Sequence, residues 1–342
     1  MQCALLVRAF LSEELMKNIT NNSNVPLGMA AYLAFDEYDF KPSDKAISTT
    51  SIIKSIRQII LTRRVASEND TSEDVLDRVN SRVGHAVHDA IERVWLDPEK
   101  RTKALQALGW SNSRIERVLV NPQEDELFDG CIPIYMEQRG EYTINGWSIS
   151  GKFDRVDDGH LSDYKTTSTY TYINQSNRDK YILQGSIYKV IHNNIINGAE
   201  LTIQYWFKDW SKAKALIDSK YPASPVLAQK LPLMTEEETV EYLDYKTKQL
   251  NHFESKPESE LPKCTDNDLW RDAPKFKYYS NPDNLTRATK NFDNLIAANT
   301  HMHQQGKGIV LVEQGKVRAC NYCLGRYACS QYKEYINAGL ID

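Results

Sequence analysis

Apolar residues recur every three or four positions in two stretches of the N-terminal third, which is the spacing of one helix face. The first stretch, residues 51–64, begins among hydroxyl side chains that can cap a helix, Thr49, Thr50 and Ser51. The second, residues 73–95, is predicted to be a long amphipathic helix that carries His88. Helices are also predicted over residues 181–196 and 230–253.

Between these helices the pattern changes to short runs rich in Ile, Tyr, Thr and Val, separated by Gly, Asn and Asp. Residues 132–140, 142–156 and 160–166 predict a meander of antiparallel strands, and residues 201–210 predict a further strand. Helices and strands therefore mix along the chain, which indicates an α/β (α+β) fold class.

The composition is that of an ordinary globular protein. The 342 residues are 41% hydrophobic and 26% charged, which suits one large domain or a core domain with a smaller appendage. No run of about 18 apolar residues predicts a membrane helix. The opening MQCALLVRAFLSEELMKN reaches acidic residues too soon for a secretory signal peptide, so we expect a cytoplasmic protein with no membrane partner.

The net charge of −4 lacks the basic surplus that many nucleic-acid-binding domains carry. A local basic face is still possible, because residues 51–64 contain no acidic residue. The predicted contacts to a DNA backbone are the basic side chains of that stretch, Lys54, Arg57, Arg63 and Arg64.

The sequence GKFDRVDDGHLSDYKT, residues 151–166, predicts a β-hairpin that gathers charged side chains. Its strands are residues 152–156 and 161–165, joined by a tight turn. Asp163 and Lys165 are two apart and share one face of a strand, and Asp154 can meet them from the neighbouring strand.

Two carboxylates beside an ammonium group favour a bound divalent cation, because like charges a few ångströms apart raise each other's pKa. Oxygen ligands suit Mg²⁺ or Mn²⁺, which can polarise a phosphoryl oxygen and lower the pKa of a bound water. Lys165 could orient that water or stabilise the developing charge. The alternative is a solvated hairpin with an incidental ion pair.

Two helical positions add candidate side chains. His88 lies one turn after Gly84 and is either a metal ligand or a structural histidine. Gln184 and Tyr188 are four apart and share a helix face, where they could hydrogen-bond a DNA phosphate or the catalytic lysine. Otherwise they are edge residues of an amphipathic helix.

In chain order these residues form a motif series: Gly-x-x-x-His, Gly-x-x-Asp, Asp-x-Lys-Thr and Gln-x-x-x-Tyr. The series resembles that of RecB-type nucleases of the PD-(D/E)XK superfamily, over about residues 49–210, and the flanking IYMEQRG and FKDW resemble phage-encoded members. The resemblance implies a restriction-endonuclease-like core, a central mixed β-sheet flanked by helices.

The same resemblance implies a role for each matching residue. His88, Asp154 and Asp163 would bind Mg²⁺ or Mn²⁺, Lys165 would assist hydrolysis, and Gln184 and Tyr188 would support the site. Glu137 is a looser candidate, for an acidic rim.

Four of the six cysteines lie in the C-terminal part of the chain. CNYCLGRYAC contains Cys320, Cys323 and Cys329, and Cys264 is the expected fourth ligand of one metal centre. The triplet is similar to that of iron–sulfur nucleases, which implies a [4Fe-4S] cluster. In those proteins the remaining cysteine precedes the catalytic histidine, whereas Cys264 follows the site.

Because of that departure, a structural zinc ion stays open as the alternative, since four thiolates also form a tetrahedral zinc site. Cys3 and Cys131 are interpreted as ordinary thiols.

These observations predict four consecutive segments: an N-terminal segment (1–45), a nuclease core (46–215), a helical connector (216–262) and a helical cysteine-rich lobe (263–342). The predicted function is a metal-dependent DNA nuclease, an exonuclease in preference to a structure-specific endonuclease. The alternatives are a non-catalytic DNA-binding module and, disfavoured for want of histidine clusters, a small-molecule metalloenzyme. Its partners would be DNA and recombination or replication proteins, in the host cytoplasm if the protein is phage-encoded.

Overall fold

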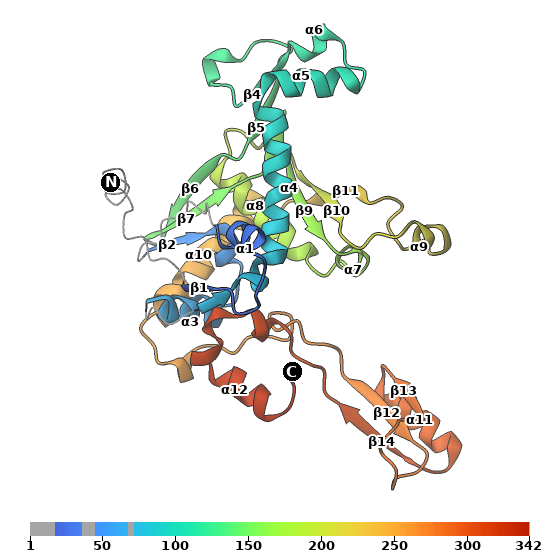
Figure 1. Cartoon of the computed structure of the whole chain (residues 1–342). Helices are drawn as coiled ribbons and strands as arrows, with labels where there is room; N and C mark the ends of the chain where they lie inside the picture. The colour runs from blue at the N-terminus through green and yellow to red at the C-terminus, as the bar shows by residue number, and fades with distance from the viewer. Residues whose placement is uncertain (1–17, 36–44, 68–71, 342) are drawn as a thin grey trace, which may run out of the picture. The chain divides into compact units, whose positions relative to one another are not determined.

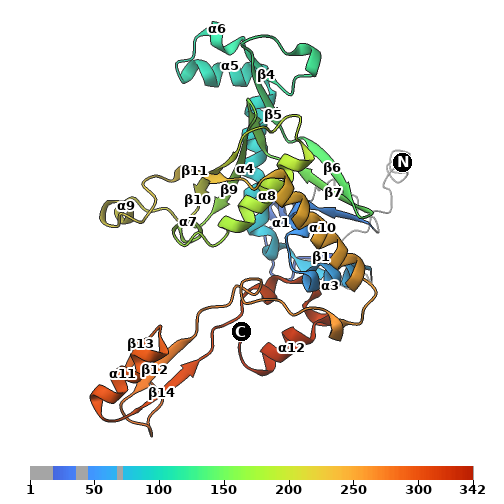
Figure 2. The same ribbon diagram turned by 180° about the vertical axis from the view of Figure 1, so that it is seen from behind.

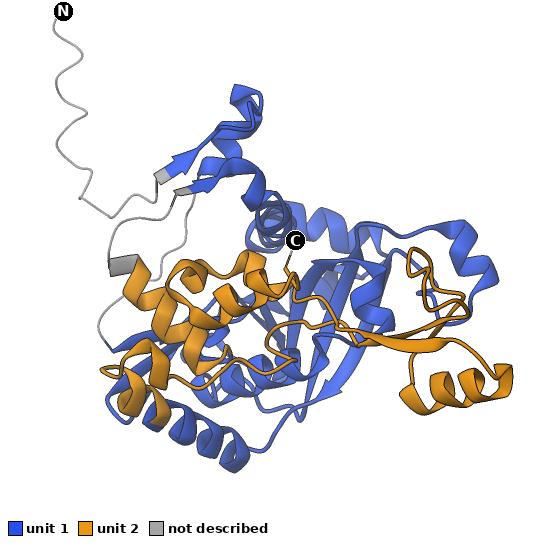
Figure 3. Cartoon of the chain, turned by 90° about the horizontal axis from the view of Figure 1, so that it is seen from below, with its two compact units in different colours: residues 1–53, 72–248 blue, residues 54–71, 249–342 orange. Residues whose placement is uncertain are grey.

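The computed structural model describes residues 18–35, 45–67 and 72–341. The chain divides into two compact units, residues 1–53 with 72–248 and residues 54–71 with 249–342 (Figure 3). The second unit thus combines a segment from inside the predicted core with the C-terminal part of the chain. The sequence prediction divided the chain into consecutive segments and so did not include a unit built from two separate stretches.

The first unit is built around a six-stranded mixed sheet (Figure 1). Strands β4 and β5 are parallel, as are β9 and β10, and the other neighbours are antiparallel. This confirms the predicted central mixed sheet. The order is β11-β10-β9-β8-β5-β4, with bounds Val118–Val120 (β4), Ile132–Met136 (β5), Arg155–Asp157 (β8), His160–Thr167 (β9), Glu200–Phe207 (β10) and Val226–Pro232 (β11).

The predicted antiparallel meander is wrong, because its strands belong to two sheets. Strands β6 (Arg139–Ile144) and β7 (Trp147–Lys152) pair through a turn at Asn145 and Gly146, and β2 (Ala46–Ser48) completes a separate three-stranded sheet. The chain leaves the main sheet after β5 at Glu137, whose φ is +53°, and re-enters at β8.

Helices lie on both faces of the main sheet. Helix α4 (Val79–Leu96) crosses the front in Figure 1, and α8 (Arg178–Ile191) crosses the front in the reverse view of Figure 2. The remaining helices of this unit are α1 (Leu27–Ala34), α2 (Thr49–Ile52), α5 (Pro98–Ala107), α6 (Asn112–Ile115), α7 (Thr169–Ile173) and α9 (Lys212–Ile217). Helix α10 (Glu236–Phe253) begins in this unit and ends in the second.

All four predicted helices have boundaries that differ from the sequence prediction. The helix predicted over residues 181–196 is α8, which begins at Arg178 and ends at Ile191. The helix predicted over residues 51–64 is two helices, α2 and α3 (Ile56–Ser67), and the unit boundary falls between them. Helix α4 begins only at Val79, because a short strand, β3 (Ser72–Asp74), which pairs with β1 (Asn18–Thr20), and a 3-10 turn (Val75–Arg78) precede it. Lys230 lies in β11, before α10.

The core of the first unit lies between α8 and the sheet. Gly185 lets α8 approach closely, since a Cβ there would lie 2.9 Å from a Leu201 methyl carbon. Each fully buried aliphatic or aromatic side chain contributes about 1.5–3 kcal/mol. The buried residues are Phe153, Val156, Leu161, Tyr181, Tyr188, Ile196, Leu201, Ile203, Tyr205, Phe207 and Leu231.

The second unit joins α3 to the cysteine-bearing segments. A Cβ at Gly325 would lie 2.7 Å from the Leu61 Cβ, so glycine permits the close packing of α3 on the 3-10 turn Leu324–Ala328. An unpredicted three-stranded sheet, ordered β13-β12-β14, lies between Cys264 and Cys320 in the sequence. The strands of this sheet are β12 (Lys275–Tyr279), β13 (Lys290–Phe292) and β14 (Ile309–Glu313). The other elements of the second unit are the helices α11 (Leu295–Gln305) and α12 (Ser330–Asn337) and the 3-10 turns Glu258–Glu260 and Ala319–Tyr322.

Among the helices in the described ranges, none combines the length and apolar character that a bilayer crossing requires.

Candidate active site and cysteine cluster

The β8–β9 hairpin brings its charged side chains together. Asp158 and Gly159 form its turn with φ of +46° and +82°. Asp154 immediately precedes β8, and its Oδ2 accepts a hydrogen bond of 2.7 Å from the backbone N–H of Tyr164. Asp154 is therefore fixed between Asp163 and Lys165, the neighbours of Tyr164 on β9.

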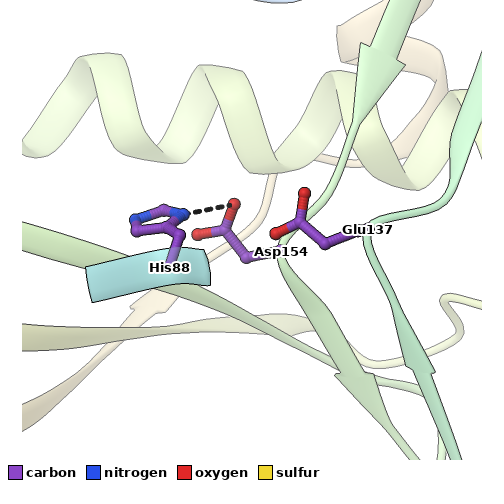
Figure 4. Close-up of side chains that lie close together, drawn as sticks. All are labelled: His88, Glu137 and Asp154. Atoms are coloured by element: carbon purple, nitrogen blue, oxygen red, sulfur yellow. Dashed lines mark ion pairs between the residues drawn. The ribbon is translucent and has the colours of Figure 1, made fainter. Parts of the chain in front are cut away.

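His88 reaches the same point from α4. Its Nδ1 lies 3.5 Å from Oδ1 of Asp154, and its Nε2 lies 3.1 Å from the carbonyl oxygen of Tyr164. Figure 4 shows the Asp154 carboxylate between His88 and Glu137. Ligand atoms of these three residues all lie within 4.8 Å of one another, close enough to bind one ion.

Glu137 thus lies closer to the centre than the acidic rim that the sequence suggested. Its Oε2 is 2.8 Å from Nζ of Lys152. The sequence pattern could name Glu137 only as a looser candidate, because its position beside the metal-binding residues depends on the turn after β5, where its φ is +53°.

Asp163 is paired with Lys165, with Oδ2 and Nζ 2.5 Å apart. This oxygen is buried, and its charged partner is the Lys165 ammonium group. Burial lowers the pKa of Lys165, but the carboxylates of Asp163 and Asp154 raise it more. Burial and then Asp163 raise the pKa of Asp154 well above its ordinary value.

These carboxylates fit a divalent cation. Several acidic groups share a buried space, and one ammonium group compensates only part of their charge. Carboxylate ligands suit Mg²⁺ or Mn²⁺.

Gln184 and Tyr188 face the same cavity from α8. Nε2 of Gln184 donates a 2.8 Å hydrogen bond to the Tyr188 hydroxyl, which is buried. Burial, followed by the charge of Asp163, raises the pKa of Tyr188, so the phenol stays protonated. The pair forms an uncharged wall beside the lysine.

Basic and hydroxyl side chains that the sequence analysis missed also line this cavity. Arg82, His85, Asp89 and Glu92 follow one another at spacings of three or four residues along α4, so this polar face beside His88 could have been found from its periodicity. Nε of Arg82 is buried without a hydrogen-bond partner among the described residues. The other lining residues are Ser48, Thr49, Thr50, Arg139, Ser150, Gly151 and Lys152.

The predicted DNA contact by Arg57 requires correction, because this side chain is only 2% exposed. Its guanidinium donates to the carbonyl oxygens of Leu261 (3.0 Å) and Pro262 (3.1 Å). Arg64 donates to the carbonyl of Glu254 at 3.0 Å. Lys54 is exposed and Arg63 half-buried, and their contact with DNA stays a prediction.

The second unit brings the four expected cysteines to one cavity, lined by Cys264, Cys320, Cys323 and Cys329. Burial, followed by the neighbouring thiols, raises the pKa of Cys320 to about 12. The Gln331 side chain accepts from the backbone N–H of Cys264 (2.9 Å) and donates to its carbonyl (3.0 Å), which holds this cysteine in place.

The remaining cysteines are Cys131 and Cys3. Cys131 is half-buried and lies in the first unit. Cys3 lies outside the described residues.

Comparison with known proteins gives one family. A family model described as the PD-(D/E)XK nuclease superfamily matches residues 62–330, a range that includes both the hairpin and the four cysteines. No curated protein matches the chain. Among solved structures, the crystal structure of SSO0001 aligns with a TM-score of 0.38 and 12% identity, covering 65% of this chain and 84% of that chain.

Proposed function

Since this chain belongs to the PD-(D/E)XK nuclease superfamily, we propose that it is a metal-dependent deoxyribonuclease that hydrolyses DNA phosphodiesters beside His88, Glu137 and Asp154. The observation that carries the proposal is spatial: Asp163, Lys165 and these three residues come from four different elements or turns and line one cavity.

His88, Glu137 and Asp154 would hold Mg²⁺ or Mn²⁺, with Asp163 as an adjoining ligand. Bound there, the ion would polarise a phosphoryl oxygen and lower the pKa of the attacking water. Lys165 places an ammonium group where negative charge develops on the phosphate. Gln184 and Tyr188 would support the site as uncharged, hydrogen-bonded side chains that line the same cavity.

Arg82 and Arg139 are the proposed contacts to neighbouring phosphates. Both line the catalytic cavity, and guanidinium groups bind phosphate oxygens with two parallel hydrogen bonds. They supply a basic surface at the reaction centre in a protein whose net charge is −4.

We assign the protein to the RecB-like, phage-type exonucleases on the order of its motifs, with DNA and recombination or replication proteins as partners in the cytoplasm. The motif order His88, Asp154, Asp163-x-Lys165 and Gln184-x-x-x-Tyr188 supports this subtype.

The cysteine cavity is proposed to hold a [4Fe-4S] cluster in preference to zinc. This preference rests on the similarity of the triplet Cys320, Cys323 and Cys329 to that of iron–sulfur nucleases. The four cysteines line one cavity, as either centre requires.

The test uses end-labelled linear DNA and closed circular DNA, each with Mg²⁺, Mn²⁺ or EDTA. We expect metal-dependent degradation of the linear substrate and resistance of the circle. Asp163→Asn serves as the inactive control. Cleavage of the circular DNA would show that the protein is an endonuclease. Tight DNA binding without cleavage in either metal would show that it is a binding module.

A further inference from the structure

We propose that Arg57 is a positioning residue of the cysteine cluster, whose guanidinium donates a hydrogen bond to Cys329 and compensates the negative charge of a thiolate-bound metal centre. The inference rests on the proposed cysteine-ligated centre and extends it to a residue that is not a ligand.

All five N–H groups of Arg57 have an acceptor, which fixes the plane of the guanidinium. Nε donates to the carbonyl of Pro262, and Nη2 donates to the carbonyls of Glu258 (3.2 Å) and Leu261. Nη1 donates to the Glu258 carboxylate and, at 3.5 Å, to Sγ of Cys329. The sulfur therefore receives a donor that the other four contacts hold in place.

Glu258 connects this cation to the chain beside the cysteine. Its Oε1 also accepts hydrogen bonds of 2.9 Å from the backbone N–H and the hydroxyl of Ser330, the residue after Cys329. Glu258 thus aligns Arg57 and the start of α12 together. A second sulfur has a similar neighbour, because the Ser55 hydroxyl lies 3.2 Å from Sγ of Cys264.

The charge balance explains why a buried arginine lies here. A metal ion or iron–sulfur cluster with four thiolate ligands carries net negative charge, and burying it costs free energy unless a cation or hydrogen bonds compensate. Hydrogen bonds to ligand sulfurs and nearby charge also set the reduction potential of such clusters. Arginine suits this place better than lysine, because its fork binds three carbonyls and a sulfur at once.

The test compares metal retention in the wild type, Arg57→Gln, Arg57→Lys and a matched control, Arg64→Gln. Arg64 lies on the same helix and also donates to backbone carbonyls of the second unit, those of Glu254 and Lys256, whereas the donor to Cys329 is Arg57. Each full-length protein is purified without oxygen, its iron, sulfide and zinc are measured, and loss of metal to a chelator is followed.

We expect Arg57→Gln to retain metal ten- to a hundredfold more weakly than the wild type, as changes beside metal ligands typically do. Arg57→Lys should also be weakened, and Arg64→Gln should retain metal like the wild type even if its melting temperature falls. If iron is present, the midpoint potential of Arg57→Gln should shift downward, because the more negative reduced state loses a cation.

Equal retention in Arg57→Gln and Arg64→Gln would overturn the role of Arg57 while leaving the metal centre standing. If Arg57→Gln does not fold, wild-type retention in Arg57→Lys would overturn it instead. A wild-type protein free of iron and zinc would refute the cysteine centre itself, and the inference with it.

Discussion

Lys165 and Asp163 form an ion pair in the catalytic cavity, and removing the charge of Lys165 should affect both cleavage and stability. The Asp163 side chain is 5% exposed and that of Lys165 is 22% exposed. Lys165→Met should reduce the single-turnover cleavage rate about 100-fold or more, because it removes a charge aimed at the reacting phosphate. It should also lower the free energy of unfolding by about 1–3 kcal/mol, because Asp163 is left buried and unpaired.

The double variant Asp163→Asn/Lys165→Met is the control for this prediction. It should regain part of the lost stability, as measured by urea unfolding, and stay inactive. Cleavage by Lys165→Met at the wild-type rate would show that Lys165 has no catalytic role.

The raised pKa of Asp154 predicts that the stability of the metal-free protein depends on pH. Because its pKa is raised in the folded state, the folded protein keeps a proton that the unfolded chain releases. This contribution is present below the ordinary aspartate pKa of about 4 and is lost as the pH rises through the raised value. In EDTA, the melting temperature of the wild type should therefore fall with rising pH relative to that of Asp154→Asn.

Adding Mg²⁺ should stabilise the wild type more at high pH than at low pH, because the ion replaces the proton. Parallel melting profiles of the two proteins in EDTA would contradict the raised pKa of Asp154.

The positions of site residues could be predicted where residue type and sequence spacing point to the same contact. They could not be predicted where the contact depends on which side chains are buried. The hairpin spacing was enough to suggest that Asp154, Asp163 and Lys165 meet. It could not show that Glu137 joins His88 and Asp154, because that contact depends on where β5 ends. The sequence pattern placed Arg57 on the surface, because a helix pattern does not reveal which polar side chains turn inward to satisfy carbonyl groups.

At the scale of elements, the turn at Gly159 controls the hairpin that carries the acidic residues. Gly159 and Gly146 both have positive φ, +82° and +80°, in turns of two different hairpins. A Cβ at Gly159 would also meet the Asn197 side chain, at 2.0 Å from Oδ1, whereas nothing lies within 4 Å of one at Gly146.

We therefore expect Gly146→Ala to cost about 1–2 kcal/mol from backbone strain alone. Gly159→Ala should cost more, because Asn197 must move, and only this variant should also lower kcat. Thermal unfolding and cleavage rates measure both effects. Equal stability and equal activity of the two variants would show that the β8–β9 turn does not position the site.

The types of the main elements followed from their periodicity, but their partners did not. Hydrophobic spacing identified α4 and α8 and the strands near residues 132–166. It could not assign β6 and β7 to a separate sheet, because both sheets use the same alternating pattern. Nor could it find the break between α2 and α3, where the isoleucine spacing continues although the two helices belong to different compact units.

For the whole molecule, the cysteine centre should contribute to the stability of the second unit. Cys264 and Cys320 are separated in sequence by the β12–β14 sheet and α11, so one metal centre would close a long loop. Metal binding to such a site becomes part of the folding free energy. Cys323→Ser and Cys264→Ser should lose metal and lower the melting temperature, with activity falling as a consequence.

Cys131→Ser is the matched control, because Cys131 is a free cysteine of the first unit. It should melt like the wild type and retain full metal content. Wild-type melting of Cys323→Ser, in protein that contains neither iron nor zinc, would refute the shared site.

The discontinuous second unit also sets an order of events during synthesis. Arg57 is made 272 residues before Cys329, the sulfur to which it donates. At a synthesis rate of about 5–20 residues per second, the segments that pack on helix α3 are synthesised tens of seconds after α3 itself. Its buried face, including Leu61 and Arg57, is without them throughout that interval. Nascent chains stalled before residue 264 should therefore expose α3 to proteases and chaperones, and release of the complete chain should protect it.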